Sequence, residues 1–171
     1  KTGRDIKDLG AQLPPGTIPR VITLIQRVSE AAVTVDDRIV GRIGGGILAL
    51  IGFERGDGPA QIDKLLTRVL TYRIFPDEAG RMNLSLADTG GGLLLVPQFT
   101  LAADTQKGTR PGFSTAAAPE LARTLFAECV ALARARHADV SEGEFGAHMR
   151  VSLINDGPVT FWLRTAPDGK E

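Results

Sequence analysis

Cysteine and histidine are scarce in this chain: its 171 residues include one cysteine and two histidines. A single cysteine excludes a disulfide within the chain and a metal site built from several thiolates. The histidines, His137 and His148, supply too few ligands for a typical histidine-based metal centre. The composition therefore disfavours metal-centred chemistry.

Long apolar runs and an excess of one charge are also missing. No stretch approaches the roughly 18 apolar residues of a membrane span, and no basic segment leads into an apolar stretch with a small-residue cleavage site at the start. Twenty Lys and Arg balance twenty Asp and Glu, which argues against a protein that binds polyanions through a charged tail but permits a local basic patch. We expect a soluble, cytoplasmic protein.

Length and composition favour one globular domain. Hydrophobic residues make up 43% of the chain and charged residues 23%, as is typical of folded proteins, and the 5% of aromatic residues predicts a mostly aliphatic core. Residues 1–20 have weak periodicity and two adjacent prolines, so we interpret them as an N-terminal extension. The domain is expected over residues 21–165, followed by a tail at 166–171.

Apolar periodicity predicts short strands and two main helices. One helix begins at Pro59 with apolar residues three to four apart through Leu70, and a second begins at Pro119 with a similar stripe through Leu132. Strands are predicted at 21–28, 31–35, 38–43, 47–53, 73–75, 93–96, 139–141, 148–155 and 159–163. Because strands and helices do not alternate regularly, we expect a mostly antiparallel α+β fold rather than a doubly wound parallel sheet.

Three familiar kinds of site are not indicated. The triple glycines at 44–46 and 90–92 feed strands, whereas a phosphate-binding loop feeds a helix, so turn glycines are the better interpretation. Cys129 lies on the apolar face of a predicted helix, which favours a packed, inert thiol. Neither histidine has a serine or cysteine partner in a recognisable motif, so a catalytic triad is not expected.

Two polar segments are stronger candidates for a functional role, although each also has a structural interpretation. Residues 97–101 follow a buried strand and alternate polar with apolar side chains, which fits an edge strand with Pro97 where no ladder bond is needed. Residues 155–160 have the sequence Asn-Asp-Gly-Pro-Val-Thr, which fits a hairpin turn between two strands. Each segment by itself is compatible with a purely structural role.

Together with other short motifs, these two segments resemble the D-aminoacyl-tRNA deacylase family. The similarity extends from Val21 to about Leu163. Each motif is weak by itself, but their common order and spacing make a specific signal. The matching residues are Gln26-Arg27-Val28, Arg73-Ile74-Phe75-Pro76-Asp77, Met82-Asn83, Gln98-Phe99-Thr100-Leu101, Ala103-Asp104, Gly108, Arg110-Pro111, Gly143, Phe145-Gly146, Met149 and Asn155-Asp156-Gly157-Pro158-Val159-Thr160.

One position departs from the family pattern. In the family, the motif that contains Gln98-Phe99-Thr100 commonly begins with a serine, where this chain has Pro97. No role of that serine hydroxyl is therefore carried over. Related deacylases with another substrate preference also have proline there, usually with alanine in place of Phe99. The presence of Phe99 and of the intact Gly157-Pro158 pair favours the D-specific branch.

The resemblance implies a function, a partner and an architecture. It implies hydrolysis of the ester that joins a D-amino acid, or glycine, to the 3′ end of tRNA, without a metal or an organic cofactor. It also implies a barrel-like core and a homodimer in which a cis Gly157-Pro158 enters the partner subunit's pocket. The carbonyls of this pair would face the amino acid and exclude an L side chain by clash, and Asn155, Val159 and Thr160 would complete the substrate-binding segment.

The resemblance also assigns catalytic roles. It places Gln98, Phe99 and Thr100 at the catalytic centre, with backbone N–H groups near Phe99 and Thr100 stabilising the oxyanion. No base adjoins the Thr100 hydroxyl in the sequence, so we expect Thr100 to position the substrate rather than attack it. The resemblance implies that the 2′-hydroxyl of the terminal ribose activates the attacking water, and we expect Gln98 to orient the pocket loops.

Contacts to RNA phosphates are expected from basic residues despite the zero net charge. Lys107 and Arg110 flank Gly108 in a loop just after the catalytic segment and are the best candidates, with a solvated polar loop as the alternative. Arg27 either lines the site and contacts tRNA or has a structural role.

Two other functions are compatible with these residues. The first is a related editing deacylase that removes a mischarged L-amino acid from tRNA, a shift with which Pro97 is compatible. The second is a non-catalytic, β-rich dimer that binds a small ligand or an RNA end. Comparison of D- and L-aminoacyl-tRNA substrates separates the first alternative, and binding without turnover identifies the second.

Overall fold

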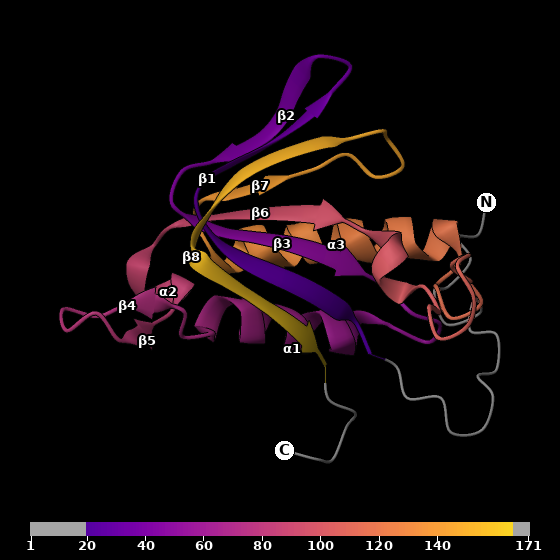
Figure 1. The fold of residues 1–171 in the computed structure, drawn as a ribbon, viewed down its shortest axis with the longest axis horizontal. Helices are drawn as coiled ribbons and strands as arrows, with labels where there is room; N and C mark the ends of the chain where they lie inside the picture. The colour runs from indigo at the N-terminus through magenta and orange to yellow at the C-terminus, as the bar shows by residue number, and fades with distance from the viewer. Residues whose placement is uncertain (1–19, 166–171) are drawn as a thin grey trace.

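Two long strands run through the computed structural model, which describes residues 20–165 (Figure 1). Strands β1 (Ile22–Val35) and β8 (Arg150–Arg164) pair antiparallel over nearly their whole length. The strands predicted at 21–28 and 31–35 therefore form one strand. Residues 1–19 and 166–171, on which the predicted extension and tail fall, lie outside the described residues.

The pairing of β1 with β8 is interrupted at residues 155–160. Gln26 lies opposite Thr160 and Val28 opposite Asn155, so two steps along β1 correspond to five steps along β8. The extra residues, 156–159, leave the ladder as a bulge, after which β8 continues along the same neighbour. The hairpin turn predicted here is wrong, because both halves of β8 pair with β1 rather than with each other.

Four further strands complete a mixed sheet around the barrel-like core. They are β2 (Arg38–Ile43), β3 (Gly46–Gly52), β6 (Gly92–Pro97) and β7 (Val140–Glu142). The order is β2-β1-β3-β6-β7, with β8 pairing with β1. All pairs of β1 are antiparallel, whereas β3 with β6 and β6 with β7 are parallel. The Ser141 hydroxyl of β7 donates to the Arg42 carbonyl oxygen of β2 at 2.9 Å, so the sheet nearly closes on itself.

The two long helices are α1 (Pro59–Thr71) and α3 (Pro119–Arg136), which begin at the predicted prolines. Both pack against one side of the sheet (Figure 1). In the sequence, α1 connects β3 to β6 and α3 connects β6 to β7. Each helix is therefore the crossover connection that a parallel pair of strands requires. The predicted α+β class is confirmed. In the described part of the chain, no helix is long and apolar enough to cross a membrane. The short elements are β4 (Phe75–Pro76), β5 (Met82–Leu84), α2 (Leu86–Thr89) and the 3₁₀ helix η2 (Phe99–Ala102).

The central strands are buried on both faces. Along β3, Ile47, Ala49 and Ile51 pack in the cluster that contains the helices, whereas Leu48 belongs to a second cluster inside the barrel. Residues 93–96 of β6 alternate in the same way. Strands covered on both sides need apolar residues at every position, which accounts for the continuous apolar runs in the sequence.

The interpretation of two sequence features as structural is supported by their surroundings. A Cβ at Gly46 would lie 1.9 Å from the Gly92 carbonyl oxygen, so the glycines at the starts of β3 and β6 permit close contact between parallel strands. Cys129 is fully buried on α3, and burial raises the pKa of its thiol to about 12. A thiol with that pKa stays protonated at neutral pH and is a poor nucleophile.

A buried carboxyl group stabilises the turn that precedes α1. Asp57 is 5% exposed, and its Oδ2 accepts a hydrogen bond from the Glu54 backbone N–H at 2.7 Å. The same turn holds the segment before α3, because the Arg55 N–H donates to the Thr115 carbonyl oxygen at 2.9 Å. The pKa of Asp57 is raised to about 7, chiefly by burial and to a smaller extent by the nearby Glu54 carboxylate, against the hydrogen bond from the Glu54 N–H, which lowers it.

We expect Asp57→Asn to reduce the loss of stability as the pH rises. A carboxyl group whose pKa is higher in the folded state contributes stability that is complete below about pH 4 and is lost as the pH rises through about 7. The asparagine keeps an acceptor for the Glu54 N–H but carries no charge. Thermal unfolding of both proteins at about pH 5.5 and about pH 8.5 measures the effect. Equal losses of Tm in both proteins would contradict it.

Candidate active site

The segment that follows β6 is a tight turn fixed to the end of β3. The Gln98 N–H donates to the Ile51 carbonyl oxygen at 2.7 Å, and the Leu101 N–H donates to the Gln98 carbonyl oxygen at 3.2 Å. A Cβ at Gly52 would lie 2.9 Å from the Gln98 oxygen, so glycine is needed for this approach. The predicted edge strand is therefore wrong beyond Pro97: the chain leaves the sheet and forms η2.

The start of η2 presents backbone donors together with two exposed side chains. Phe99 and Thr100 occupy the first positions of this helix, where N–H groups have no acceptor within the helix. Both side chains are exposed, and the Gln98 side-chain amide donates to the Thr100 hydroxyl. The three predicted catalytic residues, which are consecutive in the chain, thus lie at one turn, where the Gln98 side chain contacts the Thr100 hydroxyl.

The bulge of β8 has its own hydrogen bonds. The Asn155 side chain accepts from the Val159 N–H at 2.9 Å and donates to the Thr160 hydroxyl at 2.8 Å. These contacts bracket Gly157 and Pro158, both of which are exposed. The bond between them is cis, and Gly157 has a φ of +135°, a conformation that favours glycine. All five predicted residues of this segment therefore form one local structure.

Arg27 holds the bulge against the turn after α1. Its side chain is 13% exposed, and it forms an ion pair with the Asp156 carboxylate at 3.2 Å. Its guanidinium also donates to the Asp156 carbonyl oxygen at 3.1 Å and to the Ile74 carbonyl oxygen at 2.7 Å. These contacts support the structural alternative for Arg27, whereas its predicted contact with tRNA stays a prediction.

Within one chain, η2 and the bulge lie at opposite ends of the central strands. The bulge leaves the ladder beside Val28, which pairs with Gly46 at the start of β3, whereas Gln98 is bonded to Ile51 near the end of β3. Five residues of strand separate these levels, roughly 17 Å at the usual rise of a strand. Figure 1 shows the bend of β8 at the left and the ends of β3 and β6 at the right. A single copy therefore does not bring the two segments together.

A basic loop lies next to η2. Asp104 and Gly112 exchange two backbone hydrogen bonds, of 2.8 and 2.9 Å, which close the loop that carries Lys107 and Arg110. Both basic side chains are exposed. Phe113 follows this closure, and its ring centre lies 5.1 Å from that of Phe99. The fold therefore holds the predicted phosphate-binding residues close to the predicted catalytic segment.

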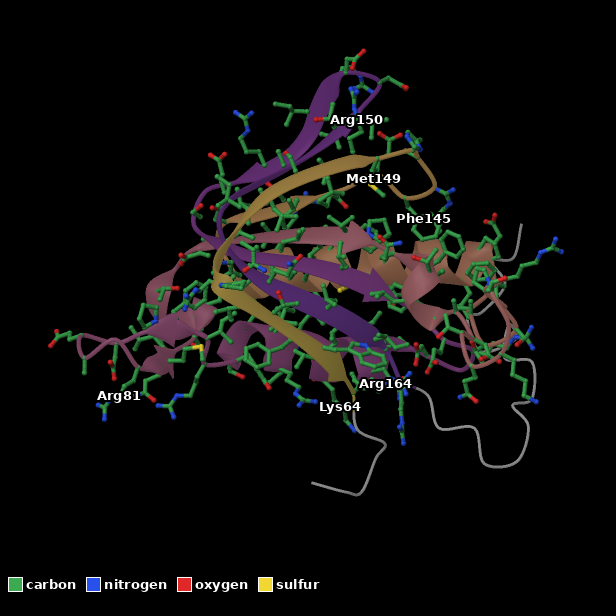
Figure 2. The ribbon with its side chains drawn as sticks, in the orientation of Figure 1. Lys64, Arg81, Phe145, Met149, Arg150 and Arg164 are labelled. Atoms are coloured by element: carbon green, nitrogen blue, oxygen red, sulfur yellow. The ribbon has the colours of Figure 1, made fainter. Side chains whose placement is uncertain are left out.

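A cavity of about 420 Å³ lies between α3 and the segment after β7. Its wall consists of Val40, Arg123, Phe126, Ala127 and residues 142–145. The Gly143 N–H donates to the Leu95 carbonyl oxygen at 2.8 Å, which places this wall beside the last residues of β6. Phe145 and Met149 lie at the same end of the molecule (Figure 2).

This cavity and the place of Arg123 in its wall were not predicted from the sequence. Phe145 was identified only as part of the family pattern, without a role. The sequence signal was the cluster of Gly143, Phe145 and Met149 beyond the second helix. Arg123 carried no signal, because an arginine on an amphipathic helix is usually a solvated residue.

Comparisons with known proteins agree with the fold and the motifs. The profile of the family described as D-Tyr-tRNA(Tyr) deacylase matches residues 24–164. A D-aminoacyl-tRNA deacylase of Thioalkalivibrio sulfidiphilus is 67% identical over 147 residues, which cover 86% of this chain and 99% of that protein. One from Janthinobacterium sp. is 59% identical with the same coverage.

Solved structures show the same architecture. A structure described as c-Myc DNA Unwinding Element Binding Protein matches with a TM-score of 0.81 and 33% identity, over 85% of this chain and 99% of that one. A structure described as a probable eukaryotic D-amino acid tRNA deacylase matches with a TM-score of 0.75 at 19% identity and the same coverage, which supports the fold alone. By its sequence over residues 24–164, this chain belongs to the D-Tyr-tRNA(Tyr) deacylase family.

Proposed function

We propose that this protein hydrolyses the ester of D-aminoacyl-tRNA, releasing tRNA and the free D-amino acid, and that it also accepts glycyl-tRNA. Family membership across residues 24–164 is the observation that carries the proposal. The exposed Gly157-Pro158 segment and the backbone donors of η2 supply the two parts that such a reaction needs. An aminoacylated tRNA as substrate implies that the protein acts in the cytoplasm.

Selection by handedness would come from the main chain of Gly157 and Pro158. Gly157 has no side chain to obstruct the substrate, and the hydrogen bonds of Asn155 hold the segment in one shape. Two fixed carbonyl oxygens can accept from the substrate ammonium and leave no space on the side where an L side chain projects. Such a filter does not contact the side chain of a D-amino acid, so it accepts many D-amino acids and glycine.

Bond breaking would rely on the backbone of η2. The N–H groups of Phe99 and Thr100 are fixed before the reaction begins, which is what stabilisation of a developing oxyanion requires. A water oxygen attacks the ester carbonyl carbon, the bond to the ribose 3′-oxygen breaks, and the proton of the water passes to that oxygen. The ribose 2′-hydroxyl would activate the water, because Thr100 contacts an amide donor and no base.

We propose that two copies of the chain share each site as a homodimer. The separation of η2 from the bulge in one copy supports this arrangement, since a two-fold axis can place the bulge of one subunit beside η2 of its partner. Large apolar side chains on β8 also support an interface: Ile154 is 55% exposed and Trp162 is 61% exposed.

RNA would bind along the side of the molecule that contains η2, the basic loop and the cavity. Lys107 and Arg110 extend from the closed loop beside Phe99 and would neutralise phosphates. The cavity beside the end of β6 would receive the terminal nucleoside, because its volume of about 420 Å³ lies in the usual range for small-molecule sites.

Pro97 is compatible with one alternative activity. The same architecture is related to an editing deacylase that removes an L-amino acid from mischarged tRNA, and the loss of the usual serine is compatible with a shift toward it. Under that alternative, the same site would hydrolyse L-alanyl-tRNA.

The decisive experiment compares four substrates at equal concentration. We expect hydrolysis of D-tyrosyl-tRNA and glycyl-tRNA, with L-tyrosyl-tRNA and L-alanyl-tRNA slower by at least about a hundredfold, since a clash with the main chain costs several kcal/mol. Release of labelled amino acid measures the rates. Equal rates for D- and L-tyrosyl-tRNA would refute the proposal, and preferential hydrolysis of L-alanyl-tRNA would establish the alternative.

Substitutions in η2 separate backbone catalysis from a side-chain nucleophile. We expect Thr100→Ala to lower kcat/KM by less than about tenfold, since it removes one exposed hydrogen bond. Phe99→Pro removes an N–H at the first helical position, where proline fits, and should cost about a hundredfold or more. Phe99→Ala keeps that N–H and is the control. Complete loss of activity in a folded, substrate-binding Thr100→Ala protein would identify Thr100 as the nucleophile.

Mixed dimers test whether the site is shared. A Cβ at Gly157 would lie 2.7 Å from Val159 Cγ2, so Gly157→Ala should distort the bulge and abolish activity. Subunits with Gly157→Ala and subunits with Phe99→Pro, inactive by themselves, should together regain about a quarter of wild-type activity, because half the dimers have one intact site. If each site is formed by one subunit, mixing restores nothing.

A further inference from the structure

We propose that Arg123 binds the phosphate on the 5′ side of the terminal nucleoside and thereby positions the 3′ end of the RNA in the cavity. The inference rests on the proposed function, because it takes an RNA 3′ end as the ligand of the cavity. It assigns a role to a residue that belongs to none of the motifs by which the family was recognised.

Arg123 is held at the wall of the cavity by Phe145. Its guanidinium carbon lies 4.8 Å from the centre of the Phe145 ring, and its Nη1 donates a long hydrogen bond of 3.4 Å to the Phe145 carbonyl oxygen. Contact with the ring limits the orientations of the guanidinium, so less conformational entropy is lost when it binds a ligand. The residue is exposed, which leaves its remaining N–H groups accessible to an anion.

Arg123 differs from the other arginines on α3 in that no carboxylate pairs with it among the described residues. Arg134 forms an ion pair with Glu142 at 3.1 Å, and Arg136 forms one with Asp63 of α1. Among residues 20–165, no carboxylate lies within ion-pair distance of Arg123. A guanidinium without an acidic partner keeps the planar set of donors that matches two phosphate oxygens.

The position of Arg123 fits a phosphate rather than the reacting ester. The ester must lie at η2, beyond the end of β6, whereas Arg123 lies on the wall formed by α3 and residues 142–145. The hydrogen bond from the Gly143 N–H to the Leu95 carbonyl oxygen places this wall beside the end of β6. A nucleoside bound in the cavity would therefore have its ribose 3′-oxygen toward the end of β6, where η2 follows, and its 5′-phosphate toward Arg123. Glu144 shares that wall, so the positive charge of Arg123 also offsets a nearby negative charge that would repel RNA.

The test is direct binding of uncharged tRNA over a series of salt concentrations. We expect Arg123→Ala to weaken binding about tenfold and to lower the slope of log K against log salt by about 0.7, the value for one phosphate contact in a single strand. Arg123→Lys keeps the charge and should keep most of the slope. Arg123→Gln keeps a donor for the Phe145 carbonyl oxygen and should lose the slope, which separates phosphate binding from support of Phe145.

Two controls make the test specific. Arg136→Ala removes a cation from the same helix on the side that faces α1, and it should leave both affinity and slope unchanged. With tRNA that lacks its terminal nucleotide and the phosphate preceding it, wild type and Arg123→Ala should bind equally. An unchanged slope in Arg123→Ala, or wild-type behaviour of Arg123→Gln, would overturn the assignment.

The outcomes distinguish this inference from the proposed function. If wild type binds tRNA through Arg123 but does not hydrolyse D-aminoacyl-tRNA, the deacylase proposal fails and the Arg123 assignment stands. If hydrolysis is stereospecific and the salt slope is independent of residue 123, the deacylase proposal stands and the Arg123 assignment is wrong. In an active enzyme, Arg123→Ala should raise KM about tenfold with kcat nearly unchanged, as expected for a residue that positions RNA away from the ester.

Discussion

The antiparallel pairing of β1 with β8 is the constraint on which the rest of the structure depends. It joins the two ends of the domain along nearly their whole length and is interrupted where residues 156–159 leave the ladder. The same residues include Gly157 and Pro158, so the interruption forms the predicted selectivity segment. Arg27, which comes from β1 itself, bonds to Asp156 and to Ile74 and keeps the bulge beside the strand that it left.

The second constraint is burial of the central strands on both faces. β3 and β6 are packed against helices on one side and against the barrel interior on the other, so they form a rigid platform. Because η2 is bonded to the end of β3 through Gln98, its backbone donors have a fixed position. A site that depends on main-chain groups needs this kind of support, since no side-chain rotamer can correct a misplaced backbone.

Several features were predictable from local sequence. The two helices follow from apolar spacing and from proline at their first turns, and family membership follows from short motifs in a fixed order. Other features were not predictable in this way. Asn155–Thr160 has the composition of a hairpin turn, and only the pairing of both flanks with β1 shows that the strand continues. The parallel pairing of β6 with β3 and β7 was also missed. A continuous apolar run indicates a buried strand, but it does not indicate whether the neighbouring strands are parallel or antiparallel.

The sequence by itself determined the two long helices, the continuous apolar strands and the family motifs, since these properties depend on the order of neighbouring residues. The tertiary structure alone decided that η2 and the bulge lie at opposite ends of β3 and that Arg123 meets Phe145 beside the cavity. These relations join residues that are far apart in the chain. They arise from strand pairing and helix packing, and local residue patterns do not specify which distant segments come into contact.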